Sequence, residues 1–240
     1  MRAFLPFIAL LGIAYPAMAA PLNYEICIDQ ATIDPERAAA EARKWWEETG
    51  DLAARHCEVV ALAELGALKT AAMLLDEIII SPDIKNEQRA SLYAQLSTLW
   101  KDYGDATAAR AAIDAAIKIT PEPEFLMDRA ALSAARGEWT AALNDLNRAV
   151  SRAPRNEEAL TLRASAKRQL GDLDGANIDA LAAIEIRPVS AAAWFELGMV
   201  QAALGQKDGA RRSWLKAIDL APGGPSAALA RGALQDMDGN

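Results

Sequence analysis

The chain has 240 residues, of which 52% are apolar and 24% charged. An apolar share of this size can bury a core and excludes an intrinsically disordered chain. Asp and Glu outnumber Lys and Arg by 33 to 25, for a net charge of -8, which makes nucleic acid and anionic membrane surfaces poor partners. Alanine dominates the apolar residues and β-branched and aromatic residues are sparse, so the composition predicts an all-α protein.

Residues 1–19 have the pattern of a secretory signal peptide. Arg2 precedes an apolar run, and Ala17-Met18-Ala19 is the small-residue pattern of a cleavage site. The alternative is a retained membrane anchor, but the run is shorter than the about 20 residues that a spanning helix needs. We expect an exported, periplasmic bacterial protein whose mature chain is not inserted in the membrane.

The two cysteines of the chain, Cys27 and Cys57, are predicted to pair. Export brings them into an oxidising compartment, where an even number of cysteines usually forms disulfides. The bridge would tether the otherwise loose segment 20–33 and contribute on the order of 3 kcal/mol by restricting the unfolded chain. The adjacent His56 suggests a catalytic Cys/His pair, but neighbouring helical residues point about 100° apart and a paired thiol is not a nucleophile.

Residues 34–89 alternate helix-length runs with glycines. The runs 34–50, 51–66 and 67–80 predict three helices. We interpret this region as degenerate helical repeats that form an N-terminal cap, because the terminal repeats of a solenoid diverge where they close one side of the core.

A period of 34 residues organises the rest of the chain. The blocks GEWTAALNDLNRAVSRAP (137–154), GDLDGANIDALAAIEIRP (171–188) and GQKDGARRSWLKAIDLAP (205–222) each begin with Gly, place Ala five and twelve residues after it, and end in Pro. A fourth copy, GDATAARAAIDAAIKITP (104–121), keeps this internal spacing one residue closer to its neighbour. Gly permits the positive φ that ends one helix, Pro stops the next, and Ala leaves room for a neighbouring backbone.

This pattern resembles the tetratricopeptide repeat family, whose unit is a helix A, a tight turn and a helix B. In the last unit Trp194, Leu197 and Gly198 match the Trp, Leu and Gly positions of the family, and Gln201 replaces the usual Tyr. The earlier units depart from the pattern at these positions, which hold Leu160 and Arg163-Ala164, Leu126 and Arg129-Ala130, and Tyr93, Leu96, Ser97 and Trp100.

The resemblance implies an all-α, right-handed α-solenoid of stacked antiparallel helix pairs. It implies four units and a C-terminal capping helix with a tail, over residues 90–122, 123–156, 157–190, 191–222 and 223–240. Helices A would line a concave face that binds a peptide or a partner helix.

The exposed residues of that concave face follow from their positions in the family. They are Ser91, Ala94, Thr98, Lys101, Glu124, Met127, Ala131, Glu158, Thr161, Ser165, Arg168, Ala192, Phe195 and Met199. The candidate partner-binding residues among them are Thr98, Lys101, Met127, Thr161, Arg168, Phe195 and Met199. Lys and Asn are almost absent, which disfavours the chaperone C-terminal carboxylates that some family members bind.

Two interpretations of Phe195 and Met199, which lie one helical turn apart, stay open. Exposed to solvent, they would suit an apolar anchor from a partner. Alternatively, the capping helix covers them through Leu229, Leu234 or Met237.

The sequence carries few groups suited to catalysis. It has one histidine and neither a Gly-rich phosphate loop nor an HExxH or CxxC motif, so we predict no enzyme activity, no cofactor and no metal site. We expect a non-enzymatic, exported scaffold or adaptor for protein-protein interactions that acts in the assembly of envelope complexes. The alternative is a periplasmic binding module for a glycan or a lipid, with Trp side chains as its platform.

Overall fold

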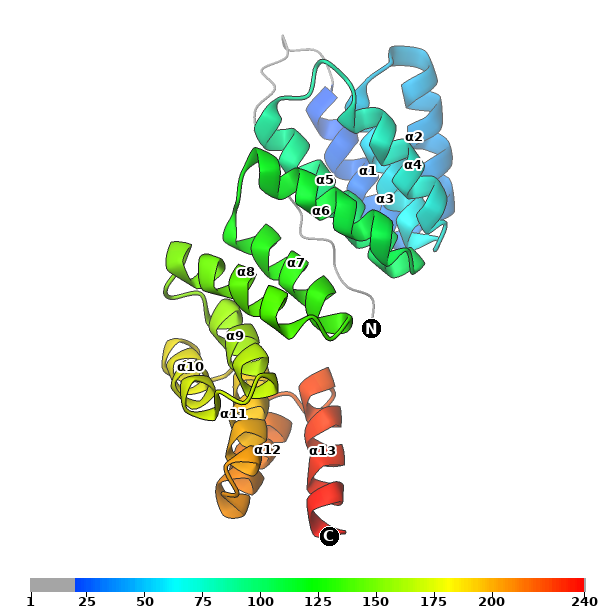
Figure 1. Cartoon of the computed structure of the whole chain (residues 1–240). Helices are drawn as coiled ribbons and strands as arrows, with labels where there is room; N and C mark the ends of the chain where they lie inside the picture. The colour runs from blue at the N-terminus through cyan, green and yellow to red at the C-terminus, as the bar shows by residue number, and fades with distance from the viewer. Residues whose placement is uncertain (1–19, 240) are drawn as a thin grey trace. The chain divides into compact units, whose positions relative to one another are not determined.

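The computed structural model describes residues 20–239, and all regular structure in this range is helical (Figure 1). Its thirteen helices belong to two compact units, of which the first ends at Pro121 and the second begins at Glu122. None of the described helices is both long and apolar enough to span a bilayer. The predicted signal peptide, residues 1–19, lies outside the described residues.

The first unit consists of six helices. They are α1 (Ala20–Ile33), α2 (Pro35–Thr49), α3 (Leu52–Glu64), α4 (Leu68–Ile79), α5 (Asn86–Tyr103) and α6 (Ala106–Ile119). The segment 20–33, which the sequence predicts to be loose apart from its tether, is helix α1. It is ordered by packing on α2 and α3, and Ile28 and Ala31 on its inner side are buried.

The second unit consists of three helix pairs followed by one further helix. The helices are α7 (Pro123–Ala135), α8 (Trp139–Arg152), α9 (Glu157–Gln169), α10 (Leu173–Ile186), α11 (Ala191–Ala203), α12 (Lys207–Leu220) and α13 (Pro225–Asp238). Each pair packs on the next, and α13 packs on α12 and α11. The elements follow the order that the 34-residue period predicts.

The turn within each pair repeats the same hydrogen bond. After α9, Gly171 has a φ of 84°, and the Asp172 amide donates to the Lys167 carbonyl at 3.0 Å. After α11, Gly205 has a φ of 76°, and Gln206 donates to Gln201 at 2.8 Å. A left-handed glycine with this backbone bond closes the free carbonyls of a helix end, so the predicted role of the repeated glycines is confirmed.

Alanines are buried between the packed helices. The two repeated alanines of each helix B in the second unit are completely buried: Ala142, Ala149, Ala176, Ala183, Ala210 and Ala217. A methyl group is the largest side chain that fits between close-packed backbones without forcing the helices apart. The alanine positions predicted from the sequence are therefore buried positions of the core.

Gly198 on α11 makes a closer approach still. A Cβ atom built on it would lie 2.4 Å from the indole ring of Trp214 on α12, and the Trp214 side chain is buried. The glycine therefore provides the space that the indole fills.

Candidate functional site

Cys27 and Cys57 form a disulfide that joins α1 to α3, with their Cα atoms 6.2 Å apart. Ile28 and Ala42 pack around the bridge. Cys57 is completely buried. The disulfide therefore belongs to the core of the first unit.

His56 lies next to the bridge and is buried. Its Nε2 is 2.9 Å from Gln95 Oε1 and its Nδ1 is 2.9 Å from the Tyr24 hydroxyl. The amide oxygen can only accept, so Nε2 carries the proton and Nδ1 accepts from Tyr24. Burial lowers the pKa of His56, and only the Gln95 hydrogen bond acts against it.

The same burial raises the pKa of Tyr24 to about 12, so both rings of this contact are neutral at pH 7. Both His56 nitrogens are engaged and the neighbouring sulfur is in the disulfide. The sequence Arg55-His56-Cys57 therefore holds a structural hydrogen-bond chain that links α1, α3 and α5, without the nucleophile and free base that Cys/His catalysis needs.

Two equivalent ion pairs cross the helix pairs of the second unit. Arg129 on α7 donates to both oxygens of Asp145 on α8, at 2.8 and 2.6 Å. Arg163 on α9 makes the same two bonds to Asp179 on α10, at 2.8 and 2.7 Å, and Lys167 adds a contact of 2.8 Å. Bidentate pairs of this kind fix the orientation of both side chains.

The sequence prediction missed these pairs, although a signal was present. Each Arg stands where the family usually has Leu, and in both units an Asp follows it 16 residues later. The repeats on either side lack both charges. In the repeat of α5 and α6, for example, these two positions hold Leu96 and Ala112.

Two of the predicted concave-face residues are largely buried, one by packing and one in an ion pair. Met127 is only 7% exposed. The Arg168 guanidinium donates to Glu196 on α11 at 2.6 Å, and its side chain is only 15% exposed. Burial raises the pKa of Glu196, while Arg168 opposes that shift. Family position predicts exposed groups here, but the neighbouring helices have enclosed both.

The other predicted polar residues keep part of their surface. The hydroxyls of Thr98 and Thr161 donate to backbone carbonyls of their own helices, at 3.3 and 3.0 Å. Lys101 is exposed and its Nζ lies 3.9 Å from Asp102. These side chains can therefore still reach a ligand.

Phe195 and Met199 are half-buried beneath α13. They belong to a cluster around Trp214 that includes Leu234 and Met237. Of the two interpretations left open by the sequence, the structure supports cover by the capping helix. Leu229 takes no part in this cover because it is 59% exposed.

The surface that remains on the helix A positions of the second unit is small and acidic. Glu124 on α7 and Glu158 on α9 occupy the same place in consecutive repeats and are exposed, as are Ala131 and Ala192. Ser165 is partly exposed beside them. This surface can accept hydrogen bonds and attract cationic groups, and it offers little apolar area.

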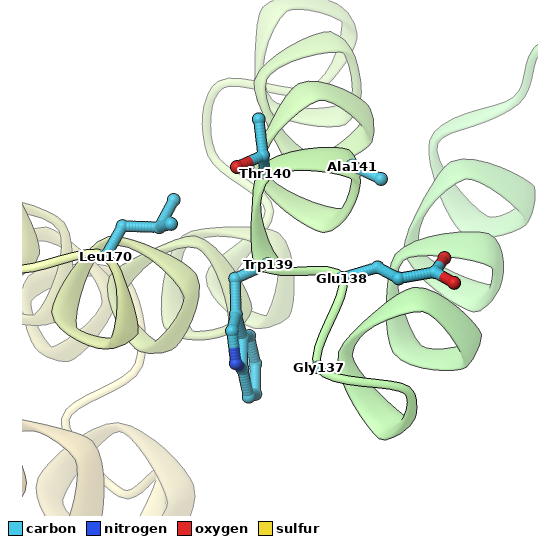
Figure 2. Close-up of a pocket in the computed structure, with 6 residues that line it drawn as sticks. All are labelled: Gly137, Glu138, Trp139, Thr140, Ala141 and Leu170. Atoms are coloured by element: carbon cyan, nitrogen blue, oxygen red, sulfur yellow. The ribbon is translucent and has the colours of Figure 1, made fainter.

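A separate hollow of about 360 Å³ opens at the turn between α7 and α8. It is lined by Gly137, Glu138, Trp139, Thr140, Ala141 and Leu170. Figure 2 shows its two large apolar side chains, Trp139 and Leu170, which come from successive helix pairs. The sequence prediction did not single out Trp139, because the other units have no aromatic residue at this position.

Comparisons with known proteins extend these observations. The family described as tetratricopeptide repeat matches residues 101–157, 133–188 and 161–225, together a little more than half of the chain. None of the curated protein sequences matches the chain.

Several solved structures share the fold. BtubC from P. vanneervenii has a TM-score of 0.66 at 14% identity, covering 80% of this chain and 90% of its own. YrrB, described as a TPR protein with an unusual peptide-binding site, has a TM-score of 0.58 at 20% identity, covering 81% and 99%. MamA from Desulfovibrio magneticus RS-1 has a TM-score of 0.59 at 17% identity, covering 80% and 98%.

Identities this low carry the fold alone, and they agree with the helix pairs and repeated turns described above. The predicted all-α solenoid of stacked helix pairs is confirmed. The chain belongs to the tetratricopeptide repeat family, whose members are generally non-catalytic scaffolds for protein-protein interactions.

Proposed function

We propose that this protein is a non-enzymatic, exported scaffold that binds a protein or peptide partner in the bacterial periplasm and serves the assembly of envelope complexes. Export is supported by the signal-like pattern of residues 1–19. It is further supported by Cys27 and Cys57, whose pairing suits an oxidising compartment. N-terminal sequencing of the protein recovered from periplasm should find Ala20 as its first residue.

The partner surface that we propose consists of Glu124, Glu158, Thr161 and Ser165 on α7 and α9. The observation that carries this assignment is that the two carboxylates recur at one repeat position and stay exposed. Charged groups on a surface steer oppositely charged partners and set specificity. A basic, extended segment of a partner therefore fits this surface best.

The test is site-specific photocrosslinking in the native cell. A benzoylphenylalanine at position 158 should yield discrete higher-mass adducts. The same group at position 181, where Leu181 is exposed on α10, is the matched control and should yield none. Charge reversal by Glu124→Arg should remove the adducts from position 158. Equal adduct patterns from positions 158 and 181 would contradict the assignment.

A glycan or lipid ligand is a second candidate, and the hollow beside Trp139 favours it. An indole face can stack on a sugar or an apolar chain. A saturable change in Trp fluorescence across a panel of glycans and lipids, lost in Trp139→Ala, would support this function over the first.

A further inference from the structure

Helix α13 packs on the second unit through partly buried Ala233, Leu234 and Met237, and few of its side chains are completely buried. Its buried side chains are Ala227 and Ala230, and no side chain caps its N-terminus. Two glycines, Gly223 and Gly224, precede it. An element with few completely buried side chains is among the first to open in local unfolding.

The repeat period identifies the place of α13 in the stack. Counted 34 residues on from α11, α13 stands in the position of a helix A. Gly232 stands where α11 has Gly198, but a Cβ on Gly232 would meet nothing within 4 Å, whereas one on Gly198 would strike Trp214. Only the face of α13 toward α11 and α12 is therefore occupied.

The surface beneath α13 is apolar. Trp214 is buried there, with Phe195, Met199 and Ile218 packed around it. Release of α13 would bring these side chains into water, which is unfavourable in proportion to the apolar area exposed. This end of the stack therefore needs a helix upon it, although that helix need not be α13.

An ion pair holds the far end of α13. Arg211 on α12 bonds both oxygens of Asp238, and the two side chains are 44% and 55% exposed. Exposed pairs contribute little to stability and weaken with salt. The pair orients α13 without locking it.

We propose that α13 is a displaceable occupant of this end surface, and that an amphipathic helix of a partner protein takes its place. The incoming helix needs small residues at the places of Ala227 and Ala230, which have no exposed surface. It needs Leu or Met at the places of Leu234 and Met237, and a carboxylate near Arg211. This inference rests on the proposed scaffold function and adds to it the chemistry of one partner and its control by α13.

The experiment uses the full chain and a fluorescent peptide of residues 224–239 as the model helix. Ala230→Glu should undock α13. Ala230 lies one repeat period after Glu196 of α11, whose charge is paired with Arg168. One period after Arg168 stands Ala202, which has no charge to offer a carboxylate at position 230. The new carboxylate would be buried without a partner.

In fluorescence anisotropy, the Ala230→Glu chain should bind the peptide at least about tenfold more tightly than the unaltered chain, whose site is filled in cis. Leu229→Glu is the matched control. It places the same charge on the same helix at an exposed position, and should bind the peptide as weakly as the unaltered chain does. A peptide that itself carries Ala230→Glu should bind neither chain.

A second variant tests the proposal independently, in case Ala230→Glu does not fold. Asp238→Lys turns the terminal ion pair into a repulsion at an exposed site, and should give an affinity between those of the other two chains. The proposal is overturned if either loosened variant keeps its helical circular dichroism and fails to gain affinity, or if the unaltered chain binds equally tightly. The crosslinks from position 158 are independent of this result, so failure of the proposed function is detected separately.

Discussion

At the scale of single residues, the contact of Gly198 with Trp214 shows how the repeat conserves volume. The two residues are 16 positions apart, and at the same places α9 and α10 have Ala164 and Ala180, both completely buried. A large residue on one helix is matched by the loss of a side chain on the other. Close packing requires this balance because interiors tolerate neither voids nor overlap.

Gly198→Ala should therefore destabilise the protein although alanine is the better helix former. The added methyl overlaps the Trp214 ring, and overpacking typically costs about 1 to 3 kcal/mol. Gly232→Ala is the control, because the equivalent methyl meets nothing, and it should stabilise by up to about 1 kcal/mol through helix propensity. Urea denaturation followed by circular dichroism measures both. Equal shifts of the two midpoints would refute the packing argument.

At the scale of helices, the bidentate pairs of Arg129 with Asp145 and Arg163 with Asp179 fix how α7 meets α8 and how α9 meets α10. Each joins a helix A to its own helix B, with both side chains largely buried. The first unit shows that the same junction between α5 and α6 can be apolar, with Leu96 and Ala112. The ion pairs are therefore a local alternative to apolar packing.

Asp179→Ala alone should cost about 3 to 5 kcal/mol, because it leaves Arg163 and Lys167 without their carboxylate in a largely buried site. The double replacement of Arg163→Leu with Asp179→Ala copies the α5 and α6 junction and should recover most of this loss. Urea midpoints of the two variants provide the measurement. A double variant that is less stable than Asp179→Ala would show that the apolar solution does not transfer between repeats.

The helices and turns could be predicted because their determinants are local. Gly171 and Gly205 end their helices through backbone conformation alone, and the repeated alanines follow the helical period. The partners of Arg168 and Met127 could not be predicted, since family position gives the face of a helix and not what the next helix places against it. Helix α1 was missed for a similar reason: its burial depends on packing against α2 and α3, which its own residues do not specify.

At the scale of the whole molecule, one buried group links stability to pH near neutrality. His56 is the only histidine of the chain, and burial lowers its pKa in the folded state. In the unfolded chain His56 has a pKa of about 6.5 and takes up a proton that it binds less readily in the folded chain. Stability is therefore fully present above this pH and is lost as the pH falls below it.

The free energy of unfolding should accordingly fall from pH 7.5 to pH 5.5, because protonation of His56 is more favourable in the unfolded chain than in the folded one. Urea titrations at the two pH values measure the difference. His56→Asn removes the titrating group and should flatten the dependence, although it lowers stability at both pH values. A pH dependence that persists unchanged in this variant would assign it to other groups.

The contacts between consecutive repeats carry a further consequence, which concerns how such a chain can change its length. Arg168 reaches forward to Glu196 in the following repeat, and Arg163 reaches back to Asn147 in the preceding one. If residues 157–190 were duplicated in tandem, the first Arg168 would face a copy of Leu162 and the second Arg163 a copy of Leu181. One guanidinium would be enclosed without an acid. The repeats share one fold but are not interchangeable, because their polar contacts specify which repeat must come next.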